Sequence, residues 1–230
     1  MSRCQHKGKG EIIESASHWN GNILCSIDVE TTGLDPLIHE IWQVAIIPLD
    51  GNFNMRKDIP PYYIFIKPEY PECVDPKAII HSKDDFKTAL TSGIDHSQAE
   101  VTLDHWMEHR LKLPLNKGKY NRCKIIPLGH NYGNFDLKFM QAWLGDNYNE
   151  WFDIHYRDTF TICSYLNDAT WNKGNTNFPF PRMRLKTLAN EFNIECDTKY
   201  CHNAMYDARI TALIYKKLIT RGFTDLNTVY

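Results

Sequence analysis

The sequence lacks the features that mark membrane proteins, secreted proteins and proteins that coat nucleic acid. No apolar run in its 230 residues approaches the ~20 residues of a membrane-spanning helix. Residues 1–10 are polar and basic, without the apolar core of a secretion signal. The seven cysteines include no Cys-x-x-Cys pair, which favours reduced thiols over a disulfide framework. A net charge of −2 argues against non-specific coating of nucleic acid. We therefore expect a cytoplasmic protein that is not attached to a membrane.

The chain also lacks internal repeats and long low-complexity linkers. We expect one folded domain over residues 21–225 behind a flexible tail of residues 1–20. Apolar runs predict strands between the turn residues 20–22 and 31–33, and at 41–48, 62–67, 123–128 and 152–156. Helices are expected at 75–81, 98–113, 135–144, 159–167, 183–192 and 203–220. Three strands with short links, followed by strand–helix alternation, indicate an α/β domain with an antiparallel meander in a mixed sheet.

Two acids interrupt the first apolar strand. Asp28 and Glu30 are two residues apart, so both point to the same face of that strand. Unpaired carboxylates on one face repel each other and lose hydration unless a cation lies between them. Hard oxygen ligands of this kind suit magnesium or manganese. A frayed strand end would also explain the pair, so further ligands must come from elsewhere in the chain.

Two predicted helices each begin an apolar face with an acid, Asp136 in one and Asp207 in the other. An acid in a first helical turn also stabilises the helix dipole by ~0.3–1 kcal/mol, which explains either acid alone. Together with the two strand acids, they would form one cation site. His202 precedes Asp207 by five residues, and five helical residues turn ~140° past a full circle. We therefore expect His202 in the turn before the helix, within reach of a water at the same site. A loop histidine hydrogen-bonded to the backbone is the alternative.

Three segments in this order resemble the three exonuclease motifs of the DEDDh family. They are Ile27–Leu34, His130–Asp136 and His202–Ala208, with softer similarity at Asp158-Thr159 and Leu185–Ala189. The family includes the proofreading subunit of bacterial replicative polymerase and the ribonuclease T group. The resemblance covers about residues 22–220. It implies a ribonuclease-H-like α/β fold with a central mixed five-stranded sheet that is flanked by helices. The sheet would consist of an antiparallel meander of three strands followed by two parallel strands. It also implies that residues 21–225 form a 3′→5′ exonuclease domain.

The resemblance further implies two divalent cations, Mg²⁺ or Mn²⁺, and a histidine general base that together release 5′-mononucleotides. The metal ligands would be Asp28, Glu30, Asp136 and Asp207, and the base would be His202. The terminal nucleotide would lie against Thr31, Thr32, Gly33, Leu34, Asn131 and Phe135. For Leu34 and Phe135, ordinary core packing is the alternative. Basic residues could guide the strand by phosphate contacts, or could be solvated loop residues: Lys112, Lys117, Lys119, Arg122, Lys124, Arg182, Arg184 and Lys186.

Three other interpretations compete with this one. His105, Glu108 and His109 match the His-x-x-Glu-His pattern of a class of zinc proteases, but the sequence offers no convincing third ligand. A non-catalytic nucleic-acid-binding module is less favoured, because all five chemical residues are present. An exoribonuclease would share every motif, since nothing in the sequence reads the 2′-hydroxyl. We expect the 3′ end of single-stranded nucleic acid as the partner, DNA more than RNA, because the compact form resembles stand-alone and phage-type DNA exonucleases. A polymerase or replication partner cannot be read from the sequence.

Overall fold

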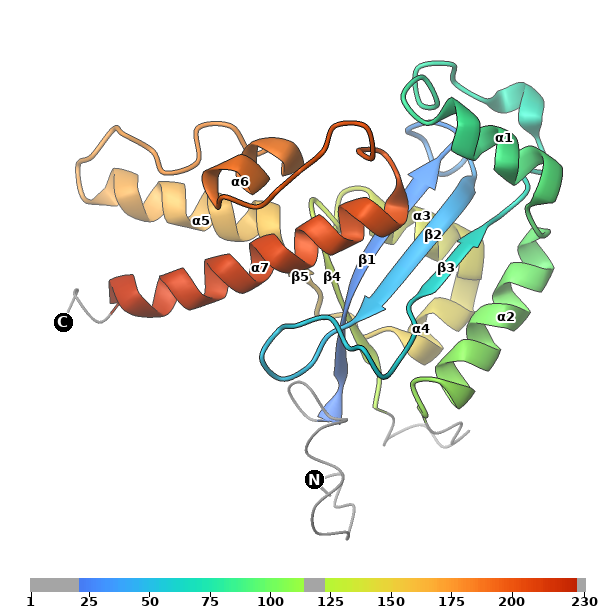
Figure 1. Cartoon of the computed structure of the whole chain (residues 1–230), viewed down its shortest axis with the longest axis horizontal. Helices are drawn as coiled ribbons and strands as arrows, with labels where there is room; N and C mark the ends of the chain where they lie inside the picture. The colour runs from blue at the N-terminus through green and yellow to red at the C-terminus, as the bar shows by residue number, and fades with distance from the viewer. Residues whose placement is uncertain (1–20, 114–122, 227–230) are drawn as a thin grey trace, which may run out of the picture.

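A computed structural model describes residues 21–113 and 123–226, with side chains up to residue 220, so the predicted tail lies outside the described residues. Its centre is a five-stranded mixed sheet with the strand order β3-β2-β1-β4-β5 (Figure 1). The strands are β1 Ile23–Thr31, β2 Ile41–Pro48, β3 Tyr62–Phe65, β4 Ile125–Gly129 and β5 Arg157–Asp158. β1, β2 and β3 pair antiparallel, whereas β4 runs parallel to β1 and β5 parallel to β4. The predicted mixed five-stranded sheet is confirmed.

Helices cover both faces of this sheet (Figure 1). They are α1 Lys83–Ser92, α2 His96–His109, α3 Asp136–Leu144, α4 Tyr148–Trp151, α5 Thr159–Asn172, α6 Leu185–Glu191 and α7 Ala204–Leu226. Helix α7 crosses one face, and α2, α3 and α4 pack on the other. Helices α5 and α6 pack with α7 in a separate apolar cluster beside the sheet. None of the helices within the described ranges is long and apolar enough to cross a membrane.

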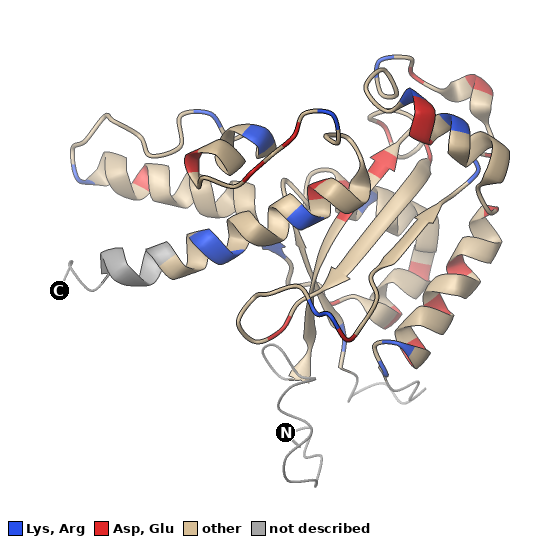
Figure 2. Cartoon of the chain, viewed as in Figure 1, with Lys and Arg blue, Asp and Glu red and all other residues tan. Residues whose placement is uncertain are grey.

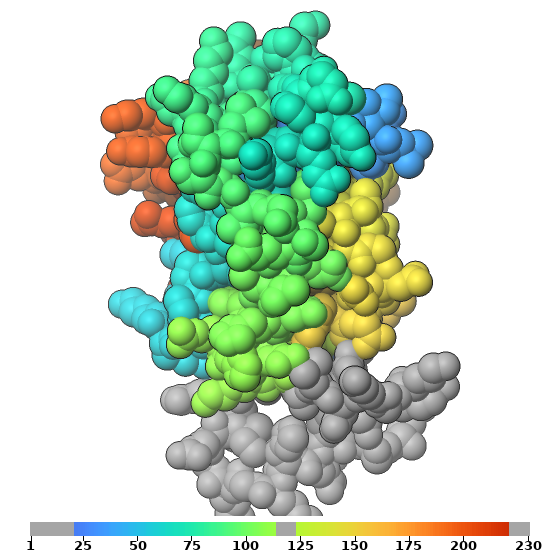
Figure 3. Space-filling view, turned by 90° about the vertical axis from the view of Figure 1, so that its right-hand side faces the viewer, coloured from blue at the N-terminus to red at the C-terminus, as the bar shows by residue number. Residues whose placement is uncertain are grey.

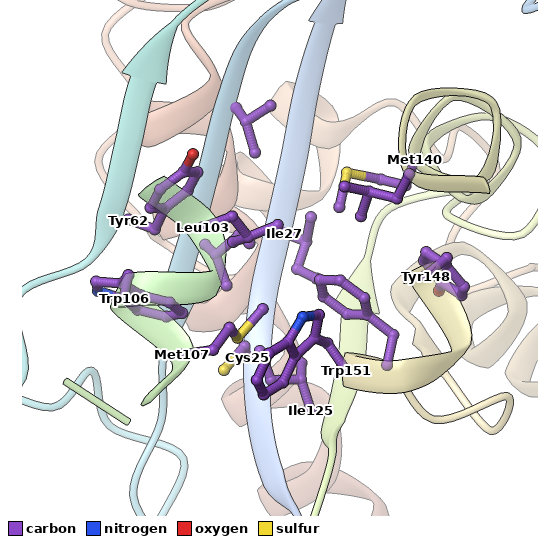
Figure 4. Close-up of a cluster of buried hydrophobic side chains, with 14 of the residues drawn as sticks. Cys25, Ile27, Tyr62, Leu103, Trp106, Met107, Ile125, Met140, Tyr148 and Trp151 are labelled. Atoms are coloured by element: carbon purple, nitrogen blue, oxygen red, sulfur yellow. The ribbon is translucent and has the colours of Figure 1, made fainter. Parts of the chain in front are cut away.

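The alternation of side chains along β1 divides the core into two layers. Cys25 and Ile27 face α2, α3 and α4, where they pack with residues such as Leu103 and Met140 (Figure 4). Leu24 faces the other way, toward α7. There α7 presents small residues at every fourth position, Ala204, Ala208 and Ala212, all buried. Small side chains let the helix backbone approach the strand, and Ser26 Oγ donates to the carbonyl of Ala208 at 2.7 Å. The even-numbered face of β1 is therefore the face that meets α7.

Two predicted elements are wrong. The helix predicted at 75–81 is a series of turns, and α1 begins only at Lys83. Asp75 causes the difference: its carboxylate accepts from the backbone N–H of Lys77, and its carbonyl accepts from that of Ala78. Such local bonds favour a turn over a helix. The strand predicted at 152–156 is instead β5 at 157–158, with only one isolated bridge, at Phe152. β5 consists of two polar residues, Arg157 and Asp158, so the sequence has no apolar pattern that would predict it.

Candidate active site

A cleft opens where β1 and β4 separate. The parallel ladder between them ends at Ser26 and Leu128, but β1 continues to Thr31. The chain after Gly129 therefore turns away from β1 at the carboxyl end of both strands, the position at which open α/β sheets bind ligands. The cleft encloses about 890 Å³. Its walls come from β1, the starts of α3 and α7, residues 77–81 and residues 183–186.

All four predicted acids line this cleft. Asp28 and Glu30 lie on the even-numbered face of β1, which α7 covers, and Asp207 stands in the first turn of α7. Asp136 is the first residue of α3, and its Oδ1 accepts from the backbone N–H of Val29 at 3.2 Å. Figure 2 shows acidic residues gathered where the carboxyl end of β1 meets the start of α7. The fold thus brings together carboxylates from three elements that are far apart in the sequence.

Burial raises the pKa of all four carboxyls, and repulsion among the four acids raises it further at Asp28 and Glu30. The pKa of Asp28 lies well above its ordinary value because of burial first, and then repulsion from Asp136, Asp207 and Glu30. The pKa of Glu30 is raised well above its ordinary value by burial and then by Asp207, Asp136 and Asp85.

The two helix-start acids behave in the same way. Burial raises the pKa of Asp136 to about 7, although backbone N–H groups, including that of Val29, favour its charged form. Burial raises the pKa of Asp207 to about 6, against the opposing hydrogen bond from the His202 N–H. Without a cation, such a site holds protons at neutral pH. Divalent cations could replace those protons, so the donor set fits hard metal ions.

His202 lies in the turn before α7, where the sequence predicted it. Its backbone is left-handed, with φ of 65°, so its N–H turns back toward Asp207 Oδ2 at 3.0 Å. Ligand atoms of Glu30, His202 and Asp207 all lie within 4.8 Å of one another. The imidazole stacks on that of His81, with ring centroids 5.1 Å apart. Partial burial, and then His81, lower the pKa of His202, so its ring is a neutral proton acceptor near pH 7.

Comparisons with known proteins agree with this geometry. The RNase_T exonuclease family matches residues 25–89, from β1 into α1. The PolC-type DNA polymerase III of Mycoplasmopsis pulmonis is 24% identical over 189 residues, 82% of this chain and 11% of the polymerase. The PolC-type enzyme of Ureaplasma parvum is 26% identical over 198 residues, 86% of this chain and 12% of the polymerase. These matches support a DEDDh-type 3′–5′ exonuclease.

Solved structures share the fold of this chain. E. coli exonuclease I in complex with a dT13 oligonucleotide superposes with a TM-score of 0.64 at 20% identity, covering 90% of this chain and 43% of that chain. Exonuclease I from Methylocaldum szegediense superposes with a TM-score of 0.63 at 21% identity, covering 87% of this chain and 40% of that chain. The chain thus spans less than half of these structures and 11–12% of the polymerases.

The cleft also contains five of the six predicted nucleotide-binding residues, Thr31, Gly33, Leu34, Asn131 and Phe135. Leu34 is 78% exposed, so core packing does not explain it. It belongs to the loop after β1, which projects from the surface in Figure 3. Phe135 also packs against Phe139, with centroids 5.0 Å apart, so part of its ring belongs to the core.

Thr32 and Gly33 have structural explanations of their own. Thr32 is 1% exposed and is not among the described residues that line the cleft. Its Oγ1 accepts from the backbone N–H of Glu40 at 2.9 Å, which ties the loop after β1 to the start of β2. A Cβ at Gly33 would lie 2.2 Å from His39 Cδ2, so this close approach requires glycine. Contact of Thr32 with a nucleotide stays a prediction.

Among the predicted basic residues, Arg184 and Lys186 line the cleft, and Lys77 joins them. Lys124 lies just before β4, at the opposite end of the sheet from the acids. Lys112 follows α2, and neither it nor Arg182 is among the cleft residues that the structure describes. Lys117, Lys119 and Arg122 lie outside the described residues.

The zinc-protease pattern does not form a three-ligand site among the residues described. The rings of His105 and His109 lie 4.3 Å apart, but no group of three potential ligands in residues 21–113 and 123–220 includes them.

Sequence reasoning missed several residues of the cleft. They are Lys77, His81, Phe160, Met183, Cys196 and Cys201. Lys77 and His81 fall in the segment that was predicted to be a helix, where a lone lysine and a lone histidine gave no signal. The turns that replace that helix bring both to the cleft, because the backbone N–H of Asp75 bonds to the carbonyl of Thr32 at 2.7 Å.

Proposed function

We propose that this domain removes nucleotides one at a time from the 3′ end of single-stranded nucleic acid, DNA in preference to RNA, and releases 5′-mononucleotides. The observation that carries the proposal is the convergence of four carboxylates and one histidine in a single cleft. The PolC-type and exonuclease I relatives support the same reaction class.

Two divalent cations, Mg²⁺ or Mn²⁺, are part of the proposal. Asp28, Glu30 and Asp207 would hold one, and Asp28 and Asp136 the other. When bound, such a pair acidifies a water and stabilises charge on the leaving oxygen. The raised carboxyl pKa values support this assignment, because these groups exchange protons for metal. A solved E. coli exonuclease I–ssDNA complex with zinc bound supports a divalent cation in this fold.

His202 would act as the general base. Its ring is close to Glu30 and Asp207, and its lowered pKa keeps it neutral and able to accept a proton from the attacking water near pH 7. His202 lines the cleft from the left-handed turn before α7 and is exposed, so solvent can reach its ring.

The cleft walls would hold the last nucleotide of the strand. Leu34 offers an exposed apolar surface for a base, while Arg184 and Lys186 offer positive charge for phosphates. Structures of E. coli exonuclease I in complex with dT13 and dA16 oligonucleotides support single-stranded DNA as the substrate. The PolC-type relatives suggest a link to a replicative polymerase.

The deciding experiment uses 5′-labelled single strands of matched DNA and RNA with magnesium. We expect a ladder that shortens from the 3′ end, mononucleotide products and faster digestion of DNA. Asp28→Asn should abolish the reaction, while Asn149→Asp, at an exposed site on α4, should not change it. Cutting of circular DNA as fast as linear DNA would contradict the proposal. Faster digestion of RNA would favour the exoribonuclease.

A further inference from the structure

A hydrogen-bonded network of four polar side chains lies under the start of α7. Gln43 from β2 accepts from the backbone N–H of Ala204 through Oε1 at 2.7 Å and donates to the hydroxyl of Tyr63 from Nε2 at 3.0 Å. Asn203 Nδ2 donates to the same hydroxyl at 2.9 Å and to Asp85 Oδ2, on α1, at 2.8 Å. The network therefore joins β2, β3 and α1 to the residue that follows His202.

Gln43 is fully buried, with 0% exposure. A buried amide is costly unless both its donor and its acceptor are used. Here the acceptor satisfies one of the free N–H groups of the helix start, at Ala204, and the donor is held by Tyr63. An apolar side chain could make neither bond, and a carboxylate could not donate to Tyr63 as the amide does.

Asn203 uses its whole amide as well. Its Oδ1 accepts from the backbone N–H of Tyr206 at 3.2 Å, which caps the helix, and this leaves both Nδ2 hydrogens for Tyr63 and Asp85. Capping alone needs only the oxygen. The two donated bonds fix the peptide beside His202, which is itself an exposed turn residue with φ of 65°.

We propose that Gln43, Tyr63, Asp85 and Asn203 are positioning residues that set where the His202 imidazole stands relative to Glu30 and Asp207. None of the four is among the described residues that line the cleft, so they do not contact the substrate there. Asp85 in addition raises the pKa of Glu30 by repulsion. The inference rests on the proposed function. It adds Gln43, Tyr63 and Asp85, which lie outside the three motifs, and gives a role to Asn203, which lies inside the third motif.

The alternative is that the network only stabilises the helix start. Asn203→Asp separates the two roles. Aspartate caps a helix about as well as asparagine, so the start of α7 is retained. The new carboxylate cannot donate to Tyr63, and it repels Asp85. We expect kcat to fall about 10-fold or more, with KM within about two-fold, because the base and not the substrate site is displaced.

A charge-neutral swap provides the rescue. In the double variant N203D/D85N, the amide at position 85 donates to the carboxylate at position 203, and the hydroxyl of Tyr63 can donate to it as well. The donors and acceptors are exchanged while the total charge of the wild type is kept. We expect kcat to return to within about three-fold of the wild-type value. Asn149→Asp adds the same charge at an exposed site on α4 and serves as the matched control.

Two outcomes would overturn the inference. One is a wild-type kcat in Asn203→Asp. The other is a double variant that regains the melting temperature but not kcat, which is the behaviour of a purely stabilising network. A second readout does not depend on turnover: the nuclear Overhauser contact between the His81 and His202 rings should weaken in Asn203→Asp and return in the swap. If the wild type has no nuclease activity but the contact between the two rings still weakens in Asn203→Asp and returns in the double variant, the proposed function is wrong. The positioning of His202 by the network would still hold.

Discussion

Replacing Asp207 by asparagine should stabilise the metal-free protein while abolishing its activity. The amide side chain is uncharged, so it no longer repels the neighbouring carboxylates of the cleft. It keeps an oxygen that can accept the His202 N–H, so the local hydrogen bond survives. The substitution therefore tests the charge alone.

The expected size follows from the pKa of this carboxyl, which burial raises from its ordinary value of 3.8 to about 6. A pKa difference of one corresponds to about 1.36 kcal/mol, so the ionised side chain destabilises the metal-free fold by at most about 3 kcal/mol. Between pH 3.8 and about 6, the folded chain keeps a proton that the unfolded chain has lost, so the free energy of unfolding falls as pH rises. Above about pH 6 Asp207 is ionised in both the folded and the unfolded chain, and the destabilisation of the metal-free fold reaches its full size.

The assay is thermal unfolding in chelator at pH 4 and at pH 8. In a protein of this size, 1 kcal/mol shifts the melting temperature by roughly 2–4 °C. At pH 8, Asp207→Asn should therefore melt up to about 6–12 °C above the wild type, whereas at pH 4 the two should melt together. Asp146→Asn removes an exposed carboxylate after α3 and should change the melting temperature neither at pH 4 nor at pH 8.

Magnesium completes the test. A cation that binds only the folded state stabilises it by RT ln(1 + [L]/Kd), so magnesium should raise the melting temperature of the wild type more than that of the variant. Suppose instead that Asp207→Asn is clearly destabilised in chelator at pH 8 and gains as much from magnesium as the wild type. Asp207 would then be a structural acid at the start of a helix, and the carboxylate repulsion would not include it.

Three further predictions concern the reaction. His202→Ala should lower kcat by roughly 10²–10⁴-fold and leave metal affinity, measured by calorimetry, nearly unchanged; a loss of metal binding would make the histidine a ligand. Wild-type kcat/KM should rise with pH to a plateau, with a midpoint below 6.5, because burial lowers the pKa of His202; a profile that falls over this range would reject the general base. His105→Ala and His109→Ala should leave magnesium-dependent digestion almost intact, and a zinc requirement traced to the two histidines would revive the peptidase.

The sequence predicted the site better than it predicted the segments around it. Asp28 and Glu30 could be found because a charged pair with the period of a strand is conspicuous inside an apolar run. Asp136 and Asp207 could be found because each begins an apolar helical face. Residues that reach the cleft through turns had no such period. His81 comes close to His202 only because Asp75 forms a turn that bonds to the loop after β1.

The network under α7 could not be predicted for a related reason. Gln43 lies in a strand that is buried on both faces, where a single polar residue has no partner in the sequence pattern. Its partners, Tyr63 and Asn203, lie on other elements, and only the paired strands and the packed helix bring the three together. Hydrogen bonds of this kind depend on tertiary geometry and not on local preference.

The hydrogen bond between Ser26 and Ala208 joins residues 182 positions apart. Its span has a consequence for protein synthesis. A ribosome makes β1, with Asp28 and Glu30, long before it makes α7, so the nascent chain carries these two acids before Asp207 exists. Under the proposed function, a growing chain therefore cannot cut nucleic acid until α7 leaves the exit tunnel and closes on the sheet.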